Sequence, residues 1–457
     1  MNVDQLKLRI VGLAAGVGGL LLQSGCARPA IDSAPAAPVC QTSVRVSIVA
    51  HNGMPRNIVP RGAEWNFGSG SLWTFNGWQY AAYWDYARQV SVARRQLPAG
   101  RWEVFSLPDY QRTESGDRGR GGAISRGFGD GHEKVAMGIS ADGFIHLSFD
   151  HHLSTLRYRV TRLPVASNPA AHKWAAGLFG PVRDNLGGPR LDCVTYPSFT
   201  ADGSDLVLYL RMGGGSGAAN SHLFTYSGGR WIINTEAGSQ FIDQKWSGGD
   251  GTVNAYPQGL AIHNGRWHIT WGWRDTPDER TSHDLCYAFS DDAGKTWHNN
   301  DGEVIGVRGK KFITADSPGV AVWKIPPGSG YRNGGSMIVD PTGRLHVLAY
   351  GGRTGGIQFM RDPETREWSR QDGAPFGAWV AGEGNSLYAV TDAALYRTAA
   401  DRLGEWTQLA ALDPAWFEDG KLVVDRNGMA YNGTIFAIGQ AGKTVRVVEA
   451  GRKAPTP

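Results

Sequence analysis

The sequence predicts an all-β fold, a seven-bladed β-propeller with four-stranded antiparallel blades, and three observations support this prediction. First, the 457 residues include 63 glycines and 17 tryptophans, and only 19% of the residues are charged. Glycine at turns and aromatic residues on strands are typical of a protein made of many short strands. Second, apolar residues at helical spacing are hard to find. Third, a turn followed by an alternating strand recurs along the chain, as in repeat architectures.

Seven copies of this turn and strand can be recognised. Most begin with Asn-Gly or Asp-Gly, which favour tight hairpins because the central residues of such turns need positive φ. The copies begin at Asn76, Asp142, Asp202, Asn264, Thr342, Gly384 and Asn427. The last three are the weakest copies, so six or eight blades remain open. A β-sandwich is the alternative fold, but it would not need one unit repeated seven times.

One of the expected blades also contains SDDAGKTW, residues 290–297. This matches the Asp-box pattern, a hairpin turn in which Asp292 accepts bonds from turn amides and Trp297 packs beneath. The motif is common on propellers of the sialidase-like type, and its role is structural. It therefore indicates the fold and says little about the activity.

The N-terminus resembles a bacterial lipoprotein signal. Basic residues precede the apolar run IVGLAAGVGGLLL, which is too short to span a membrane comfortably, and small residues then precede Cys26. We expect a signal peptide over 1–25 and lipidation of Cys26, with an ordinary secretory signal as the alternative. The chain would then be exported and anchored to the outer membrane, on its periplasmic or cell-surface face, and otherwise periplasmic or secreted. The membrane would be contacted only through the lipid.

The remaining chain divides by composition. Residues 26–45 are rich in Ala and Pro and predict a flexible tether, residues 46–450 the propeller, and 451–457 a disordered tail. The net charge of +4 and the lack of a Lys/Arg run argue against a nucleic-acid partner.

The cysteines and some of the histidines are candidates for disulfide or metal chemistry. With Cys26 lipidated, three cysteines remain, and an odd number cannot make a complete disulfide framework. His283 and Cys286 have metal-like spacing, and His222 or His268 could join them. Two ligands are a weak signal, so a structural metal stays unknown.

Histidines are concentrated around the second hairpin. In an antiparallel hairpin, residues equidistant from the turn lie opposite each other, and His132 and His152 are equidistant from Asp142-Gly143. A regular hairpin would make them face each other at its open end. A bulge would shift the register by one and make His151 the partner instead. We interpret His146, within the strand, as structural.

The same rule, that residues equidistant from the turn lie opposite each other, selects residues in the next two hairpins. Tyr196 and Arg211 are equidistant from the third turn, and Tyr256 and Arg274 from the fourth. Because strand ends of neighbouring blades converge around a propeller's axis, we expect these side chains to meet in one pocket.

A cluster of His, Tyr and Arg without an evident carboxylate pair suits β-elimination from a uronic acid more than glycoside hydrolysis. An arginine can bind the sugar carboxylate through two bonds and offset the charge that develops when the C5 proton leaves. A base takes that proton and an acid protonates the leaving oxygen on C4. This chemistry requires no cofactor, and the expected partner is an acidic polysaccharide or oligosaccharide.

Three runs resemble the bacterial-neuraminidase-repeat (BNR repeat) propeller family: GHEKVAMGISADGFIHLSFDHH, VTYPSFTADGSDLVLYLRMGGG and NAYPQGLAIHNGRWHITWGWRD. That family includes ulvan lyases and lyases that act at rhamnose–glucuronate linkages. The resemblance is good over residues 78–306 and looser afterwards. It implies the fold of a propeller and the activity of a polysaccharide lyase, although the family also contains members without shown activity.

The resemblance also implies site residues. The two histidines, tyrosine and arginine of those lyases match His132, His152, Tyr196 and Arg211 here. Arg211 would neutralise the uronate, the other three would share the base and acid roles, and Tyr256 and Arg274 would be subsite residues. The alternatives are a glycoside hydrolase of sialidase or rhamnosidase type and a non-catalytic, glycan-binding surface propeller.

Overall fold

A computed structural model describes residues 42–54, 70–112, 134–351, 355–417 and 422–452. The predicted signal peptide, Cys26 and all but the end of the predicted tether lie outside these residues. In the described part the regular structure is almost entirely β-strand, with one short α-helix, α1 (Glu236–Ser239), and short 3-10 turns. Among these residues, no helix has the length and apolar character needed to cross a membrane.

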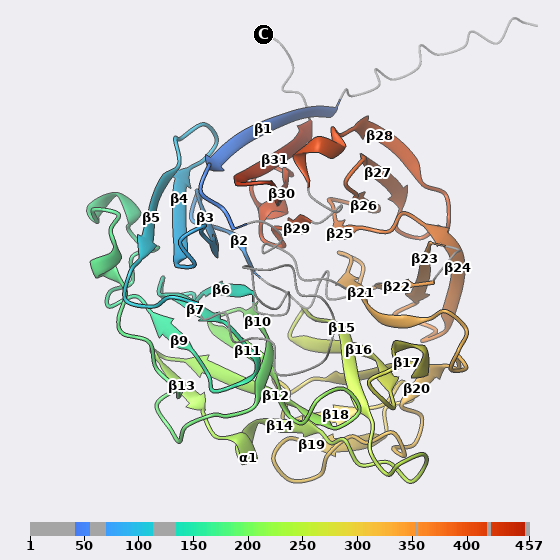
Figure 1. Cartoon of the computed structure of the whole chain (residues 1–457). Coiled ribbons are helices and arrows are strands. Elements are labelled where there is room, and N and C mark those ends of the chain that lie inside the picture. Colours follow the sequence, from blue (N-terminus) through green and yellow to red (C-terminus); the bar gives the residue numbers. More distant parts are fainter. Residues whose placement is uncertain (1–41, 55–69, 113–133, 352–354, 418–421, 453–457) are drawn as a thin grey trace, which may run out of the picture. The chain divides into compact units, whose positions relative to one another are not determined.

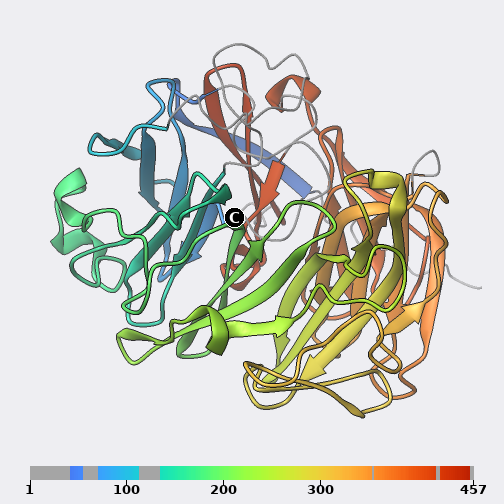
Figure 2. The ribbon, with the colours of Figure 1, turned by 60° about the horizontal axis from the view of Figure 1, so that its bottom comes forward.

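The strands form antiparallel sheets that follow one another around a ring (Figures 1 and 2). Four of the sheets have four strands each. The first contains β2 (Leu72–Phe75), β3 (Trp78–Trp84), β4 (Val90–Gln96) and β5 (Glu103–Leu107). The second contains β21 (Arg332–Val339), β22 (Leu345–Tyr350), β23 (Gly356–Arg361) and β24 (Trp368–Ala374). The third contains β25 (Ala378–Ala381), β26 (Ser386–Val390), β27 (Ala394–Ala399) and β28 (Thr407–Ala411).

The fourth of these sheets joins the two ends of the described chain. It contains β29 (Leu422–Val424), β30 (Ile435–Ala441), β31 (Thr444–Arg452) and β1 (Thr42–Ala50). Strand β1 pairs with β31, with Thr42 opposite Arg452. Residues 42–45, which composition assigns to the tether, therefore belong to this strand, because they pair along β31.

The other two sheets carry the candidate site. One has three strands: β6 (Val135–Ile139), β7 (Ile145–Phe149) and β9 (Tyr158–Val160). The other has twelve: β8 (His152–Ser154), β10 (Val194–Asp202), β11 (Asp205–Gly213), β12 (Ala219–Ser227), β13 (Arg230–Ile233), β14 (Gln240–Ile242), β15 (Asn254–His263), β16 (Arg266–Arg274), β17 (Ser282–Ser290), β18 (Thr296–His298), β19 (Val304–Val307) and β20 (Ala321–Trp323). A single parallel pair, Ala219 with Asn254, joins its two antiparallel halves.

The predicted turns lie where the sequence places them. Each of the seven copies falls between two consecutive antiparallel strands, from β2–β3 to β29–β30. Asn76 and Asn264 have φ of 48° and 50°, as a tight Asn-Gly turn requires. The seventh copy differs, because Asn427 is helical and a 3-10 turn, Gly428–Ala430, lengthens the connection.

The Asp box forms as predicted. The Asp292 carboxylate accepts bonds from the amides of Lys295 (3.1 Å) and Thr296 (2.8 Å). The Trp297 indole is fully buried and donates to the Gly294 carbonyl. The motif thus stabilises the β17–β18 turn.

The core packs within and between the sheets, and five of the described histidines are buried in it: His146, His151, His222, His268 and His346. Burial lowers the pKa of the first four to about 3. His146 lies against the Tyr158 hydroxyl (2.7 Å), which confirms its structural interpretation.

Because of these four buried histidines, we expect the folded protein to lose stability in acid. Below about pH 6.5 the unfolded chain binds protons that the native state does not, so the free energy of unfolding should fall as the pH drops from about 6.5 towards 3. Each histidine contributes up to about 1.4 kcal/mol per pH unit. Urea unfolding at a series of pH values measures this slope. A free energy of unfolding that stays constant from pH 6.5 to 4 would contradict the assignment.

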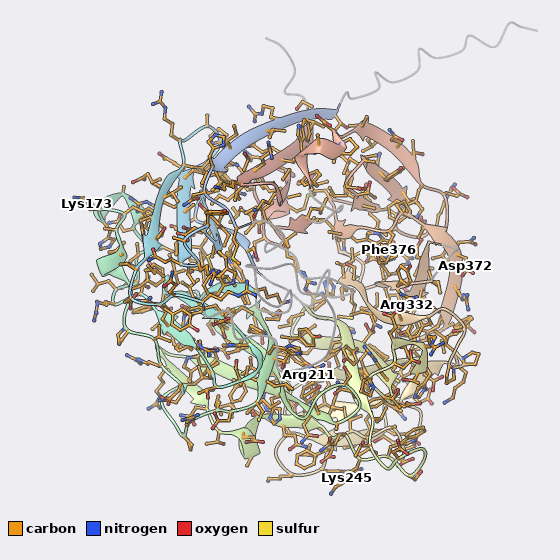
Figure 3. All side chains as sticks on the ribbon, viewed as in Figure 1. Lys173, Arg211, Lys245, Arg332, Asp372 and Phe376 are labelled. Carbon is orange, nitrogen blue, oxygen red and sulfur yellow. The ribbon has the colours of Figure 1, made fainter. Side chains whose placement is uncertain are left out.

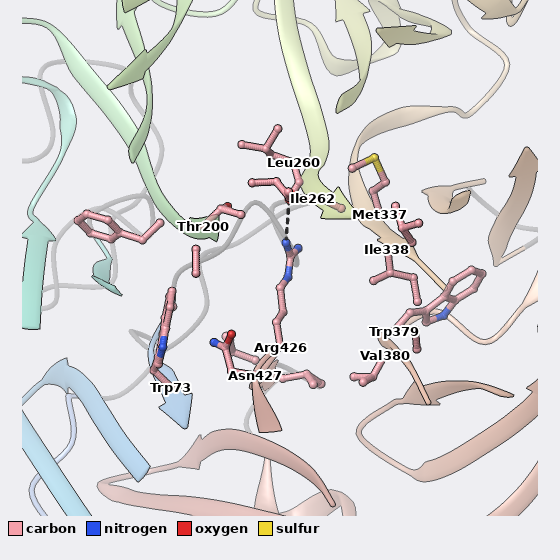
Figure 4. A pocket seen from close by; sticks show the side chains of 18 of the residues that line it. Trp73, Thr200, Leu260, Ile262, Met337, Ile338, Trp379, Val380, Arg426 and Asn427 are labelled. Carbon is pink, nitrogen blue, oxygen red and sulfur yellow. Dashed lines mark hydrogen bonds between the residues drawn. The ribbon is translucent and has the colours of Figure 1, made fainter. Parts of the chain in front are cut away.

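A cavity of about 330 Å³ opens where β2, β10, β15, β21, β25 and β29 approach one another (Figure 4). Its wall is mostly apolar, with Trp73 and Trp379 among the lining residues, and Arg426 extends to the Leu260 carbonyl (3.5 Å). The strands β10 and β15 line it with residues 199–201 and 260–262, close to their turns. The candidate site described next lies towards the other ends of these strands.

Candidate active site

Two tyrosines and two arginines gather where β10 and β15 begin and β11 and β16 end. We call Tyr196, Arg211, Tyr256 and Arg274 the phenol–guanidinium cluster. The Arg211 guanidinium carbon lies 4.5 Å from the ring centre of Tyr196 and 5.3 Å from that of Tyr256. Arg274 lies 5.5 Å from the Tyr256 ring, and the two rings are 6.3 Å apart. The structure thus brings together four of the six residues selected from the sequence, and Figure 3 shows Arg211 towards the inner side of the ring.

The predicted pairing within these hairpins is wrong, although the residues meet. Arg211 lies opposite Thr195, because a bulge interrupts the β10–β11 ladder between Thr195 and Ser198. Tyr196 occupies this bulge with φ of 57°. A left-handed conformation is unusual for an aromatic residue and costs free energy that the surrounding structure must offset. The bulge redirects the Tyr196 ring onto Arg211.

The second predicted pairing is also wrong, because Tyr256 lies opposite Gly272 and Arg274 opposite Asn254. The turn pairs His263 with Arg266, which already sets Tyr256 one residue away from Arg274. The shift between Pro257 and Gly259 adds a second residue. Both residues nevertheless remain at the open end of their hairpin. The distances from the turn therefore predict the correct end of each strand but not the residue that lies opposite each tyrosine.

Arg211 is the centre of the cluster and is only 2% exposed. One of its terminal nitrogens, Nη1, donates to the Asn254 side-chain oxygen (3.1 Å) when that amide also donates to the Ala219 carbonyl (3.1 Å). Its Nε has no hydrogen-bond partner among the described residues. Burial alone would lower the pKa of Arg211, but the oxygens of Tyr256 and Tyr196 outweigh this effect and raise it. The guanidinium is therefore a permanent cation with a donor that a ligand oxygen would satisfy.

Tyr256 is a phenol held between cations. Burial raises its pKa, but Arg211 and Arg274 lower it, as does the bond with Ser216 Oγ (2.7 Å), and the balance is a lowered pKa. Arg274 also donates through Nε to the Thr276 carbonyl (3.0 Å) and through Nη2 to the Pro277 carbonyl. These bonds fix the Arg274 guanidinium beside the phenol.

The two selected histidines have different outcomes. His132 lies outside the described residues. The β6–β7 hairpin has the predicted register, with Val135 opposite Phe149, but β7 ends there and does not continue to His152 as a regular hairpin would. Asp150 turns the chain with φ of 63°, and His152 starts β8, where it lies opposite Thr195.

His152 is nevertheless in register with Arg211. It pairs with Thr195, which pairs with Arg211, so the three residues form one row across β8, β10 and β11. Two strand spacings separate His152 from Arg211 at the backbone, roughly 10 Å. The alternative residue, His151, is fully buried, and its Nε2 lies 2.9 Å from Ser148 Oγ. His151 is therefore held inside the sheet and does not face the cluster.

Sequence reasoning missed Lys134. This residue precedes β6, is 1% exposed, and places its Nζ 5.9 Å from the ring centre of Tyr196. The register of the β6–β7 hairpin was the available signal for Lys134. Lys134 and Asp150 are equidistant from the turn, so a regular hairpin places them opposite each other at the same end as the other selected residues. The Asp150 amide does donate to the Lys134 carbonyl (3.3 Å).

The residues considered as metal ligands do not come together. His283 contacts the carboxylates of Asp275 (3.0 Å) and Asp284 (3.3 Å), which raise its pKa against the opposing effect of burial. Cys286 is buried, which raises the pKa of its thiol. His222 and His268 bond the hydroxyls of Ser239 and Tyr287. In the described part of the chain, no three His, Cys, Asp or Glu side chains are grouped to hold a metal ion.

Comparison with known proteins identifies the family to which the chain belongs. The BNR repeat-containing family matches residues 78–408. The chain belongs to this family. No curated protein matches it by sequence.

Among solved structures, the chain is similar to a polysaccharide lyase described as an ulvan lyase, bound to -[GlcA(1-4)Rha3S]-. The TM-score is 0.63 at 13% identity, over 88% of this chain and 95% of the lyase. A second structure of the ulvan lyase gives 0.61 at the same identity and coverage. A lectin of Aleuria aurantia in complex with a fucoside gives 0.37 at 15% identity, over 76% and 96% of the two chains. At 13% identity the likeness to the ulvan lyase shows the fold alone, an all-β propeller.

Proposed function

We propose that this BNR-repeat protein is a polysaccharide lyase that cleaves a uronic-acid-containing glycan by β-elimination. The observation that carries the proposal is the buried Arg211, which stacks between two phenols and keeps an unsatisfied Nε donor. The cluster contains a cation, Arg211, that could bind the carboxylate of a uronic acid. It also contains phenols that could transfer a proton. Among the described residues, no carboxyl group is one of the charges that shift the pKa of Arg211 or Tyr256, so the described part of the cluster shows no acid pair of the kind a typical glycosidase uses.

The proposed reaction uses the guanidinium of Arg211 together with one phenol and two imidazoles. Arg211 binds the uronate carboxylate and offsets the negative charge that builds up as the C5 proton leaves. Tyr196, His132 and His152 share the roles of base and acid. The base takes the C5 proton, the C4–O bond breaks as the C4–C5 double bond forms, and the acid protonates the departing oxygen. Arg274 and Tyr256 line the adjoining subsite.

The proposed substrate class is a rhamnose–glucuronate polysaccharide of the ulvan type. The shared fold with an ulvan lyase that was solved with a glucuronate–rhamnose repeat supports it. We also propose seven blades, with the twelve-stranded sheet counted as two, because among its described strands the Ala219–Asn254 pair is the one that joins β12 of the first half to β15 of the second. Each blade then holds one of the seven sequence repeats.

Product chemistry tests the proposal. Incubation with ulvan or another rhamnose–glucuronate glycan should release 4,5-unsaturated uronates that absorb in the ultraviolet. New reducing ends without this chromophore would identify a hydrolase instead. Glycan binding without any cleavage would identify a carbohydrate-binding propeller, and either result would overturn the lyase assignment.

Replacing His152 with alanine should lower kcat by about 10²–10⁴-fold, because the proposed reaction gives its imidazole an acid or base role and its backbone shares a row with Arg211 across β8, β10 and β11. His151→Gln is the matched control, since His151 is the neighbouring residue and lies inside the sheet. The initial rate of ultraviolet absorbance measures both variants. A near-normal rate for His152→Ala would remove this residue from the chemistry.

A further inference from the structure

We propose that Asp150 is a positioning residue, whose bonds to three neighbouring segments set the place of His152 in the active site. The inference rests on the proposed function for its kinetic consequence but has a structural consequence of its own. We call Asp150, Tyr110, Arg112 and Arg157 the Asp150 hub. Asp150 lies two residues before His152 and is 3% exposed.

The Asp150 carboxylate is surrounded by donors from outside its own hairpin. It accepts a hydrogen bond from the Tyr110 hydroxyl. Arg112 Nε lies 3.7 Å from one of its oxygens, and Arg157 Nε lies 3.8 Å from the other. A buried carboxylate that faces two guanidiniums is held firmly, because moving it would separate charges in a poorly solvated place.

The Asp150 backbone is held as well. Its φ of 63° is a left-handed conformation that Asp tolerates better than most side chains. Its amide donates to the Lys134 carbonyl (3.3 Å). Its carbonyl accepts from Ser154 Oγ (3.0 Å) and from Arg157 Nη1. These bonds fix the turn that takes the chain out of β7 and into β8.

The turn has a direct effect on the cluster. Had β7 continued straight, His152 would have stayed in the three-stranded sheet. Because the chain turns at Asp150, residues 152–154 instead pair with β10, and the Leu153 amide donates to Thr195 Oγ1 (3.0 Å). Thr195 is also the residue opposite Arg211. The hub therefore determines whether the imidazole and the guanidinium share one pocket.

Left-handed residues are concentrated at this junction. Besides Asp150, the residues Leu153, Cys193 and Tyr196 have φ between 54° and 57°. Such strain persists only where surrounding bonds impose it, and it is common at functional sites. The hub supplies those bonds on the β8 side of the junction.

The test is the variant Asp150→Asn, which keeps the size of the side chain and removes its charge. We expect kcat to fall about 10–100-fold with KM changed less than about threefold, because the carboxylate-binding Arg211 lies on other strands. Asp85→Asn is the matched control. Asp85 is also 3% exposed and accepts bonds from Gln89, Ser91 and Ser106, but it lies in the β3–β4 hairpin, away from the cluster. The control should keep the wild-type kcat.

A double-mutant cycle separates positioning from general loss of structure. If Asp150 acts through His152, Asp150→Asn should lower kcat little further in a His152→Ala background. Additive losses, or full activity of Asp150→Asn in an active wild-type protein, would overturn the proposal.

Hydrogen exchange distinguishes this failure from failure of the proposed function. In Asp150→Asn the amide of Leu153 should exchange at least tenfold faster, while Asp85→Asn leaves it unchanged. This readout needs no activity. An inactive wild-type protein would refute the lyase assignment alone, whereas an unchanged Leu153 amide would refute the hub.

Discussion

Replacing Tyr196 with phenylalanine should lower turnover by about 10²–10⁴-fold while leaving the fold intact. The ring that stacks 4.5 Å from the Arg211 guanidinium remains, so the packing of the cluster is preserved. Only the phenolic oxygen and its proton are lost. Whether Tyr196 acts as base or as acid, either role requires that group. The initial rate of formation of unsaturated uronate measures the effect, and the thermal unfolding midpoint checks the fold.

Tyr209→Phe is the matched control for this prediction. Tyr209 is buried on β11, two residues before Arg211, and its hydroxyl bonds Ser221 Oγ (3.0 Å). Burial raises its pKa to about 12, so it is unsuited to proton transfer near neutral pH. We expect the control to retain most of the wild-type rate. Equal rates for Tyr196→Phe and the wild-type protein would exclude Tyr196 from catalysis.

The sequence predicted the hairpins well because their signals are local. Asn-Gly turns need positive φ at adjacent residues, and Asn76 and Asn264 adopt it. The Asp box likewise closes within eight residues, through bonds from Asp292 to amides three and four positions on. The sequence also predicted that Tyr196, Arg211, Tyr256 and Arg274 meet at the ends of β10, β11, β15 and β16, and their side chains do lie together there.

The register at those ends could not be predicted, because it depends on contacts between strands. The bulge at Tyr196 adds a residue on β10 that no local pattern marks. His152 leaves its hairpin because Asp150 binds Tyr110, Arg112 and Arg157, which come from elsewhere in the chain. A regular extrapolation from the turn therefore fails where tertiary contacts bend the strand.

Arg211→Lys should lose most of the activity, with kcat down by about 10²–10³-fold although the positive charge is kept. A guanidinium presents a planar fork that can bind a carboxylate through two bonds, whereas an ammonium is a compact point charge. Lysine is also less suited to lie flat between the rings of Tyr196 and Tyr256 while it bonds Asn254. The loss should exceed the change in KM, because the charge on the carboxylate grows as the C5 proton leaves.

Arg94→Lys tests whether loss of a buried, stacked arginine alone explains the effect. Arg94 is 4% exposed, stacks on Trp78 and Trp174, and bonds Glu103, but it lies on β4 outside the cluster. It should lose stability and keep kcat, whereas Arg211→Lys should lose kcat at temperatures where it remains folded. An unaffected kcat in Arg211→Lys would mean that charge alone suffices. That result would refute the proposal that Arg211 binds the uronate carboxylate through two hydrogen bonds.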